Sequence, residues 1–318
     1  MQQITGTLVS LATYLALVAV GAFLGSRPVL RSRTLPWLGR FQTAALLLLI
    51  FTLGAELGAN EEIVASLGII GLNAFLITAA AMAGSLLAVH ILRKYILKLD
   101  KHGQPAGSAQ TQEKHGEKVK VDHTLTLLIV FTVALGMVLG HFVLPDALAV
   151  HYGQIIQLGL YLLLFLVGLD LGRHEGMLSS VRQAGLRVIL VPLAVMVGTF
   201  TVTALAGLLL PLGPKDCMAA AAGFGWYSLA PTLLAPYSLT VSATAFLSNV
   251  LHELFAIVLA PIVAQRFGYI ETVALPGAAA MDTVSATDQR MAIYSFTSGV
   301  ILSLSVPLFI PAIIALPF

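Results

Sequence analysis

The chain has 318 residues, of which 58% are hydrophobic and only 10% are charged, and its net charge is +2. A soluble domain carries about 25% charged residues, so this composition excludes an ordinary soluble protein and indicates a polytopic membrane protein. The single cysteine, Cys217, excludes an internal disulfide and a cysteine-based metal cluster.

Eight apolar runs are long enough to cross a bilayer, which takes about 20 helical residues. They cover residues 4–25, 41–59, 63–92, 124–145, 152–172, 187–210, 239–264 and 291–314. Two further apolar pieces, 217–235 and 273–286, are short and are interrupted by glycine and proline. The predicted fold is an all-α polytopic membrane protein with about eight transmembrane helices and two re-entrant or broken helical hairpins. Full crossing by both pieces would give ten spans, and that alternative stays open.

The spans fall into units separated by a polar linker. The predicted divisions are a first three-span unit at 1–92, the linker at 93–123, a second three-span unit at 124–210, and a hairpin and transport core at 211–318 with the spans 239–264 and 291–314. Gly and Gln are frequent in the linker, as is typical of a flexible segment.

The distribution of lysine and arginine predicts the orientation in the membrane. The chain has 17 lysine and arginine residues. If it crosses the membrane eight times from an external N-terminus, all of them except Lys215 lie on one face. The positive-inside rule makes this face cytoplasmic, so we expect the N-terminus outside and the linker in the cytoplasm.

Two segments of the chain resemble each other. LIFTLGAELG (49–58) matches LLFLVGLDLG (163–172) at constant spacing, and upstream AVGAFLG (19–25) matches ALGMVLG (134–140). Each unit holds three spans, an odd number, so the second copy must enter the membrane from the opposite side, which predicts an inverted repeat of the kind found in secondary transporters. The Gly-xxx-Gly spacing permits close helix contacts, either within one chain or in a homodimer.

Four acids fall at the predicted membrane depth: Glu56, Asp170, Glu253 and Asp282. An ionised carboxylate there costs about 2.5–3.5 kcal/mol, so such acids are either functional or lie at helix ends near headgroup water. Glu253 is the deepest, in SNVLHELFAIVLAPI (248–262), and Asn249 precedes it by one turn on the same helical face. A carboxylate that binds either a proton or a cationic ligand suits an exchanger. His252 points about 100° away from Glu253, and we expect it to serve in packing rather than as a ligand.

Enzyme motifs are incomplete in this sequence. His252 and Glu253 begin an HExxH pattern, but Ala256 stands where the second histidine is needed, so a zinc protease is not expected. We predict no enzymatic activity, no metal and no cofactor.

Three motifs occur in an order that resembles the lysine exporters of the LysO family: GFGWYSLAP (223–231), Asn249-xxx-Glu253, and PGAAAMD (276–282). The resemblance runs from about residue 124 onward. It implies export of L-lysine, and of cationic analogues such as thialysine, across the bacterial inner (cytoplasmic) membrane in exchange for protons or another cation.

The resemblance also implies a site. The residues expected to bind substrate or cation are Glu253, Asn249, Asp282, Tyr227, Ser228, Gly223, Gly225 and Trp226, and the candidates for the coupling ion are Glu56 and Asp170. Glu253 would bind the ammonium group or the proton that replaces it, and Asp282 would complete a second cation site. Backbone amides at the two glycines would hold the α-carboxylate.

The roles of the other predicted site residues follow from their chemistry. Asn249 and the hydroxyls of Tyr227 and Ser228 would orient the ligand, and Trp226 would close over its aliphatic stem. The expected partners are L-lysine or a similar cationic amino acid, H⁺ or Na⁺, and the lipid bilayer, with no nucleic acid. Two alternatives remain: a Na⁺/H⁺ or K⁺/H⁺ antiporter, and a passive channel or holin-like membrane module.

Overall fold

The computed structural model describes residues 2–27, 36–101, 124–144, 146–173, 187–280 and 289–317, and this part of the chain is all-helical. The α-helices are α1 (Gln2–Gly25), α3 (Pro36–Ala59), α4 (Glu61–Ala65), α5 (Leu67–Ile91), α6 (Thr124–Phe142), α7 (Asp146–Arg173), α9 (Leu190–Gly207), α10 (Gly213–Ala221), α11 (Leu229–Leu234), α12 (Leu239–Arg266), α13 (Tyr269–Ala274) and α15 (Gln289–Ile314). A π-helix, η1 (Leu92–Leu97), extends α5, and a 3₁₀ turn, η2 (Gly277–Ala279), follows α13.

Each predicted apolar run corresponds to a helix. Within the described residues, six helices are long and apolar enough to cross a bilayer: α3, α5 with its π-helical extension, α7, α9, α12 and α15. The apolar parts of α1 and α6 are shorter, at Ala12–Gly25 and Leu127–Phe142. The predicted span 63–92 begins later than expected, because Asn60 caps the short helix α4 by accepting a hydrogen bond from the Ile63 amide.

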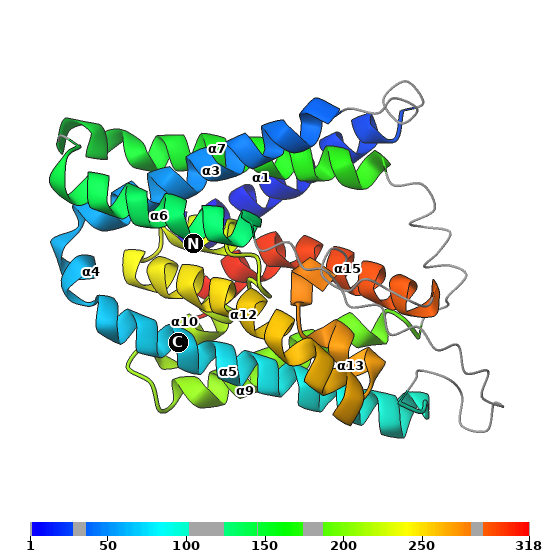
Figure 1. The fold of residues 1–318 in the computed structure, drawn as a ribbon. Coiled ribbons are helices and arrows are strands. Elements are labelled where there is room, and N and C mark those ends of the chain that lie inside the picture. Colours follow the sequence, from blue (N-terminus) through cyan, green and yellow to red (C-terminus); the bar gives the residue numbers. More distant parts are fainter. Residues whose placement is uncertain are drawn as a thin grey trace.

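Four helices form one group, which we call the panel, in the order α1, α7, α3, α6 (Figure 1). Neighbouring helices approach so closely at glycines that a side chain there would strike the adjacent backbone. A Cβ at Gly21 would overlap the carbonyl oxygen of Phe165, and a Cβ at Gly136 would overlap that of Phe51. The Gly-xxx-Gly contacts predicted from the sequence are therefore made within one chain.

The panel contacts come in matching pairs. Gly21 corresponds to Gly136 in the sequence repeat, and Phe165 corresponds to Phe51, so the two contacts above are equivalent. Three further pairs of contacts are equivalent in the same way. The contact of Gly25 with Leu169 matches that of Gly140 with Ala55, and the contact of Gly54 with Val133 matches that of Gly168 with Val18. The contact of Gly58 with Met137 matches that of Gly172 with Ala22. Each three-helix unit thus packs its first helix on the second helix of the other unit.

Corresponding helices run in opposite directions. In α3 and α7, the Gln42 side chain donates to the carbonyl of Leu166 (3.1 Å), while Leu49 lies beside Gly159. In α5 and α9, Gly84 and Gly198 meet backbone to backbone, with antiparallel neighbours on either side. These antiparallel pairs agree with an inverted repeat, which stays a prediction.

The remaining helices form a second group, which we call the core: α5, α9, α10 to α13, η2 and α15 (Figure 1). Panel and core meet through apolar side chains, such as Leu53 of α3 and Phe246 of α12 in one buried cluster. Outward-facing side chains are apolar on both groups, including Phe131 at 64% exposure and Val197 at 64%. Such a surface is suited to lipid rather than to water, so the chain is a multi-pass membrane protein.

Candidate functional site

The apolar piece 217–235, which we call the first broken piece, is interrupted in its centre; the piece 273–286 is the second broken piece. Helix α10 ends at Ala221, α11 starts at Leu229, and the backbone between them turns through two residues in the left-handed region, Phe224 (φ 47°) and Gly225 (φ 89°). A phenylalanine in that region is strained, and such strain persists only where the surroundings enforce it. Phe224 is fully buried and packs against Phe200 of α9.

The second broken piece crosses the first at this point. After α13 the chain bends at Pro276 and continues through Gly277, which also has a left-handed backbone (φ 58°). The amide of Ala278 donates to the carbonyl of Phe224 (2.8 Å). A Cβ at Gly277 would overlap that same carbonyl, so the crossing requires glycine. Two interrupted helices therefore meet through their broken backbones.

One face of α12 supplies the polar groups that this broken backbone needs. The Ser242 hydroxyl donates to the carbonyl of Pro231 in α11 (2.8 Å), and His252 Nε2 lies 2.8 Å from the carbonyl of Leu275 beside the second break. Both side chains are buried. Since a carbonyl accepts only, Nε2 carries the proton in this bond. His252 is thus buried, as expected of a packing residue, and it also makes a hydrogen bond that the sequence analysis did not predict.

Asn249 lies between them and holds the first break. Its Oδ1 accepts from the Gly225 amide (2.7 Å), and its Nδ2 lies 3.0 Å from the Ala220 carbonyl and 2.7 Å from the Ala245 carbonyl. A Cβ at Gly223 would strike the Asn249 amide group. In this conformation the Gly225 amide is therefore engaged by Asn249 and offers no hydrogen bond to a ligand carboxylate, contrary to expectation.

Trp226, Tyr227 and Ser228 continue the same turn. Ser228 is buried at the start of α11, whereas Trp226 and Tyr227 are half-buried. Trp226 packs on the cluster that contains Phe224, and Tyr227 packs on the cluster that contains Leu53 of the panel. The two aromatic side chains thus pack on two different apolar clusters.

Glu253 follows Asn249 by one turn of α12, in a helix of 28 residues that holds no other acid. The residue is half-buried, and its Oε2 atom is shielded from solvent. It therefore lies beside the polar face that holds the two breaks, as its sequence position predicts.

The other predicted acids lie apart from this crossing or outside the described residues. Glu56 is half-buried in α3 of the panel, where the neighbouring Ala55 contacts Gly140 of α6. Asp170 belongs to α7, also in the panel. Asp282 lies outside the described residues.

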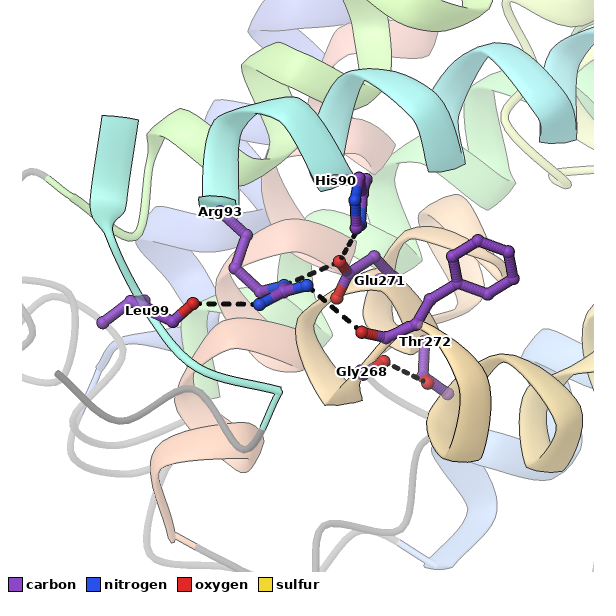
Figure 2. A network of polar contacts seen from close by, with 7 residues as sticks. His90, Arg93, Leu99, Gly268, Glu271 and Thr272 are labelled. Carbon is purple, nitrogen blue, oxygen red and sulfur yellow. Dashed lines mark hydrogen bonds and ion pairs between the residues drawn. The ribbon is translucent and has the colours of Figure 1, made fainter. Parts of the chain in front are cut away.

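A fully buried acid that the sequence analysis did not single out is Glu271 in α13 (Figure 2). Its Oε1 lies 2.6 Å from Arg93 Nε and 2.8 Å from His90 Nδ1. The sequence signal is an acid in YIETVALPG (269–277), together with an arginine at the end of the third span. The acid lies in α13, which leads into the second broken piece and is called its foot below. In the sequence, Arg93 is one of the cationic residues that the positive-inside rule places on the cytoplasmic face.

Buried hydroxyls on α15 also escaped the sequence analysis. Ser295, Thr297 and Ser298 are at most 2% exposed, and within the described residues their hydroxyl oxygens make no hydrogen bond. Among the described residues no group of three or more His, Cys, Asp or Glu side chains is placed to hold a metal ion. The buried polar side chains of the core thus include hydroxyls, amides, an imidazole, a guanidinium and a carboxylate.

Comparison with known proteins covers this same region. A family model described as "Lysine exporter LysO" matches residues 130–314. The chain is similar to the lysine exporter LysO of Escherichia coli (strain K12), at 33% identity over 166 residues, which are 50% of this chain and 55% of the relative. The chain thus spans about half the length of the curated relative that it matches. Because the family match takes in more than half of the chain, with both interrupted pieces and α12, the protein belongs to the lysine exporter LysO family.

Proposed function

We propose that the protein is a secondary active transporter that exports L-lysine, and cationic analogues such as thialysine, in exchange for protons or another cation. The bacterial inner membrane is the expected location. The observation that carries the proposal is the crossing of two interrupted helices, through Phe224 and Ala278, in a chain of the LysO family. Broken helices at membrane depth are tolerated where they are buried in protein or line a pathway, and transporters use them at their substrate sites.

Glu253 is the residue that binds the exchanged cation in this proposal. A carboxylate at membrane depth is costly when ionised, and a bound proton or substrate ammonium lowers that cost. Only one of the two can be bound at a time, which couples lysine exit to cation entry. Tyr227 and Ser228 orient the ligand, Trp226 covers its aliphatic stem, and Asp282 adds a second cation site.

Asn249 has a different part in the mechanism from the one its sequence motif suggests. Its three hydrogen bonds with Gly225, Ala220 and Ala245 make it a residue that positions the first break. Gly223 allows the close approach of Asn249, and in this conformation the Gly225 amide donates to Asn249. The Gly223 amide remains the proposed donor to the α-carboxylate.

Alternating access requires one part of the protein to move against another. The panel and the core are suited to this, because side chains such as Leu53 and Phe246 meet in one apolar cluster, and apolar contacts have no directional bonds that a sliding motion would break. Glu56 and Asp170, in the panel, are proposed as further coupling-ion sites on the other side of this contact.

The test is counterflow and gradient-driven transport of labelled lysine with purified protein in liposomes. Wild-type protein should show saturable lysine counterflow and transport driven by an imposed proton gradient. Glu253→Gln should lose gradient-driven transport by about 100-fold or more. The matched control is Glu61→Gln, which neutralises an exposed acid in α4 and should leave both activities unchanged.

Other outcomes identify the alternatives. Counterflow of labelled sodium or potassium without lysine would favour the Na⁺/H⁺ or K⁺/H⁺ antiporter. Lysine flux without saturation and without counterflow would favour a passive channel or holin-like module. Full coupled transport by Glu253→Gln would remove this residue from the mechanism.

A further inference from the structure

The buried cluster around Glu271 joins three separate parts of the core (Figure 2). Arg93 leaves the π-helix η1 and donates from Nε to Glu271 in α13 (2.6 Å), from Nη1 to the Leu99 carbonyl (2.9 Å) and from Nη2 to the Phe267 carbonyl (3.2 Å). Phe267 follows the last residue of α12. One guanidinium thus connects the end of α5, the end of α12 and the start of α13.

Backbone contacts support the same junction. The Tyr269 amide donates to the carbonyl of Lys101 (3.0 Å), and the Leu99 amide donates to the carbonyl of Arg93 (3.1 Å). Gly268, with φ 146°, lies where a Cβ would come within 2.8 Å of Glu271 Oε2 and 2.9 Å of the Lys101 carbonyl. The chain leaving α5 and the foot of the second broken piece are therefore packed without room for a side chain.

The ion pair in this cluster differs from an exchange site, because Glu271 Oε1 already contacts a permanent cation, whereas Glu271 Oε2 makes no hydrogen bond within the described residues. Glu271 is fully buried and the Arg93 side chain is 6% exposed. An arginine does not lose its proton in a protein, so it remains a permanent cation beside Glu271. Separating two charges in a dry environment, together with two more hydrogen bonds from the same guanidinium, is too costly to repeat in each transport cycle.

We propose that Arg93, Glu271 and His90 are positioning residues that fasten the foot of the second broken piece to α5, so that this piece moves together with α5 and α9 and Glu271 exchanges neither proton nor substrate. The movement of this piece during transport rests on the proposed function. The attachment of the piece to α5 does not depend on substrate. Gly84 and Gly198 already hold α5 against α9, which extends the fastened unit to both helices.

The first measurement is hydrogen exchange of the purified full chain, which needs no lysine. In Arg93→Lys, one ammonium cannot reach three acceptors in different directions, so amides of 269–274 should exchange about tenfold faster or more, and amides of α3 and α6 should not change. Lys94→Arg, at the exposed neighbouring position in η1, is the matched control and should leave all rates unchanged. Unchanged exchange in α13 of Arg93→Lys would overturn the proposal.

The second measurement is lysine transport per folded molecule, with Arg93→Lys and Glu271→Gln. Turnover should fall about tenfold while KM for lysine stays within about twofold, because the substrate site is intact and the moving piece is loosened. The pH profile should keep its shape. A flattened pH profile in Glu271→Gln would show that Glu271 exchanges protons and would overturn the proposal. If wild-type protein fails to transport lysine, the proposed function falls, and hydrogen exchange in Arg93→Lys still decides the fastening role.

Discussion

Panel and core are held together by different physics. The panel helices are continuous, so their backbone groups bond within each helix, and glycines such as Gly58 and Gly172 let neighbouring backbones touch. The core contains two interrupted pieces, and buried polar side chains such as Asn249 and His252 supply hydrogen bonds that the broken helices lack. The comparison shows that a break at membrane depth needs a polar partner from elsewhere in the chain. The panel should therefore respond to side-chain size, and the core to side-chain polarity.

The largest effect should come from the core ion pair. Glu271→Gln leaves the buried Arg93 without its countercharge, so the free energy of unfolding should fall by about 3–5 kcal/mol. Glu253→Gln keeps the shape of its side chain and should change unfolding by less than about 1 kcal/mol. Thermal unfolding of both variants in detergent checks this. Equal losses of unfolding free energy in the two variants would contradict the distinction between a structural ion pair at Glu271 and an exchange site at Glu253.

The panel should be damaged by added volume alone. Gly58→Ala and Gly172→Ala each place a methyl group against a neighbouring backbone, so each should lower the free energy of unfolding by about 1–3 kcal/mol. The two losses should be similar because the two contacts correspond in the repeat. Gly71→Ala is the control: no atom lies within 4 Å of its added Cβ, and the better helix former should be neutral or stabilising by up to about 1 kcal/mol.

A smaller effect is expected where α12 supports the second break. His252→Leu removes the donor to the buried Leu275 carbonyl, so the free energy of unfolding should fall by about 1–2 kcal/mol. His252→Gln can still donate from its amide and should recover part of this loss. Thermal unfolding separates the two variants. If His252→Leu unfolds at the same temperature as the wild type, the break does not need a polar partner from α12.

The smallest effect lies at the edge of the core, at Tyr237. Burial, the hydrogen bond to Asp216 and the charge of Asp216 raise the pKa of the Tyr237 phenol to about 12. The pKa in the unfolded chain is about 10, so the folded state holds its proton longer, and stability should fall as the pH rises from about 10 to 12. Asp216→Asn should weaken this fall. Tyrosinate absorbance, with Tyr237→Phe as reference, checks the titration.

Much of the helical framework could be predicted from the sequence, because spanning helices are recognised by apolar length alone. The breaks at 222–228 and near Pro276 were also predicted, since glycine and proline mark them. Partners could not be predicted: the motif Asn249-xxx-Glu253 gives no sign that Asn249 already bonds Gly225. Glu271 and Arg93 were missed because they are far apart in the chain, and only the fold shows that they meet.

The contact between Gly84 and Gly198 has a further consequence. These residues are related by the same offset along the chain that relates Gly54 to Gly168, so each meets its own counterpart. A surface that contacts an identical surface is the isologous arrangement of two-fold homodimers. Two separate three-helix polypeptides, inserted in opposite orientations, could therefore use this helix pair as a self-complementary contact.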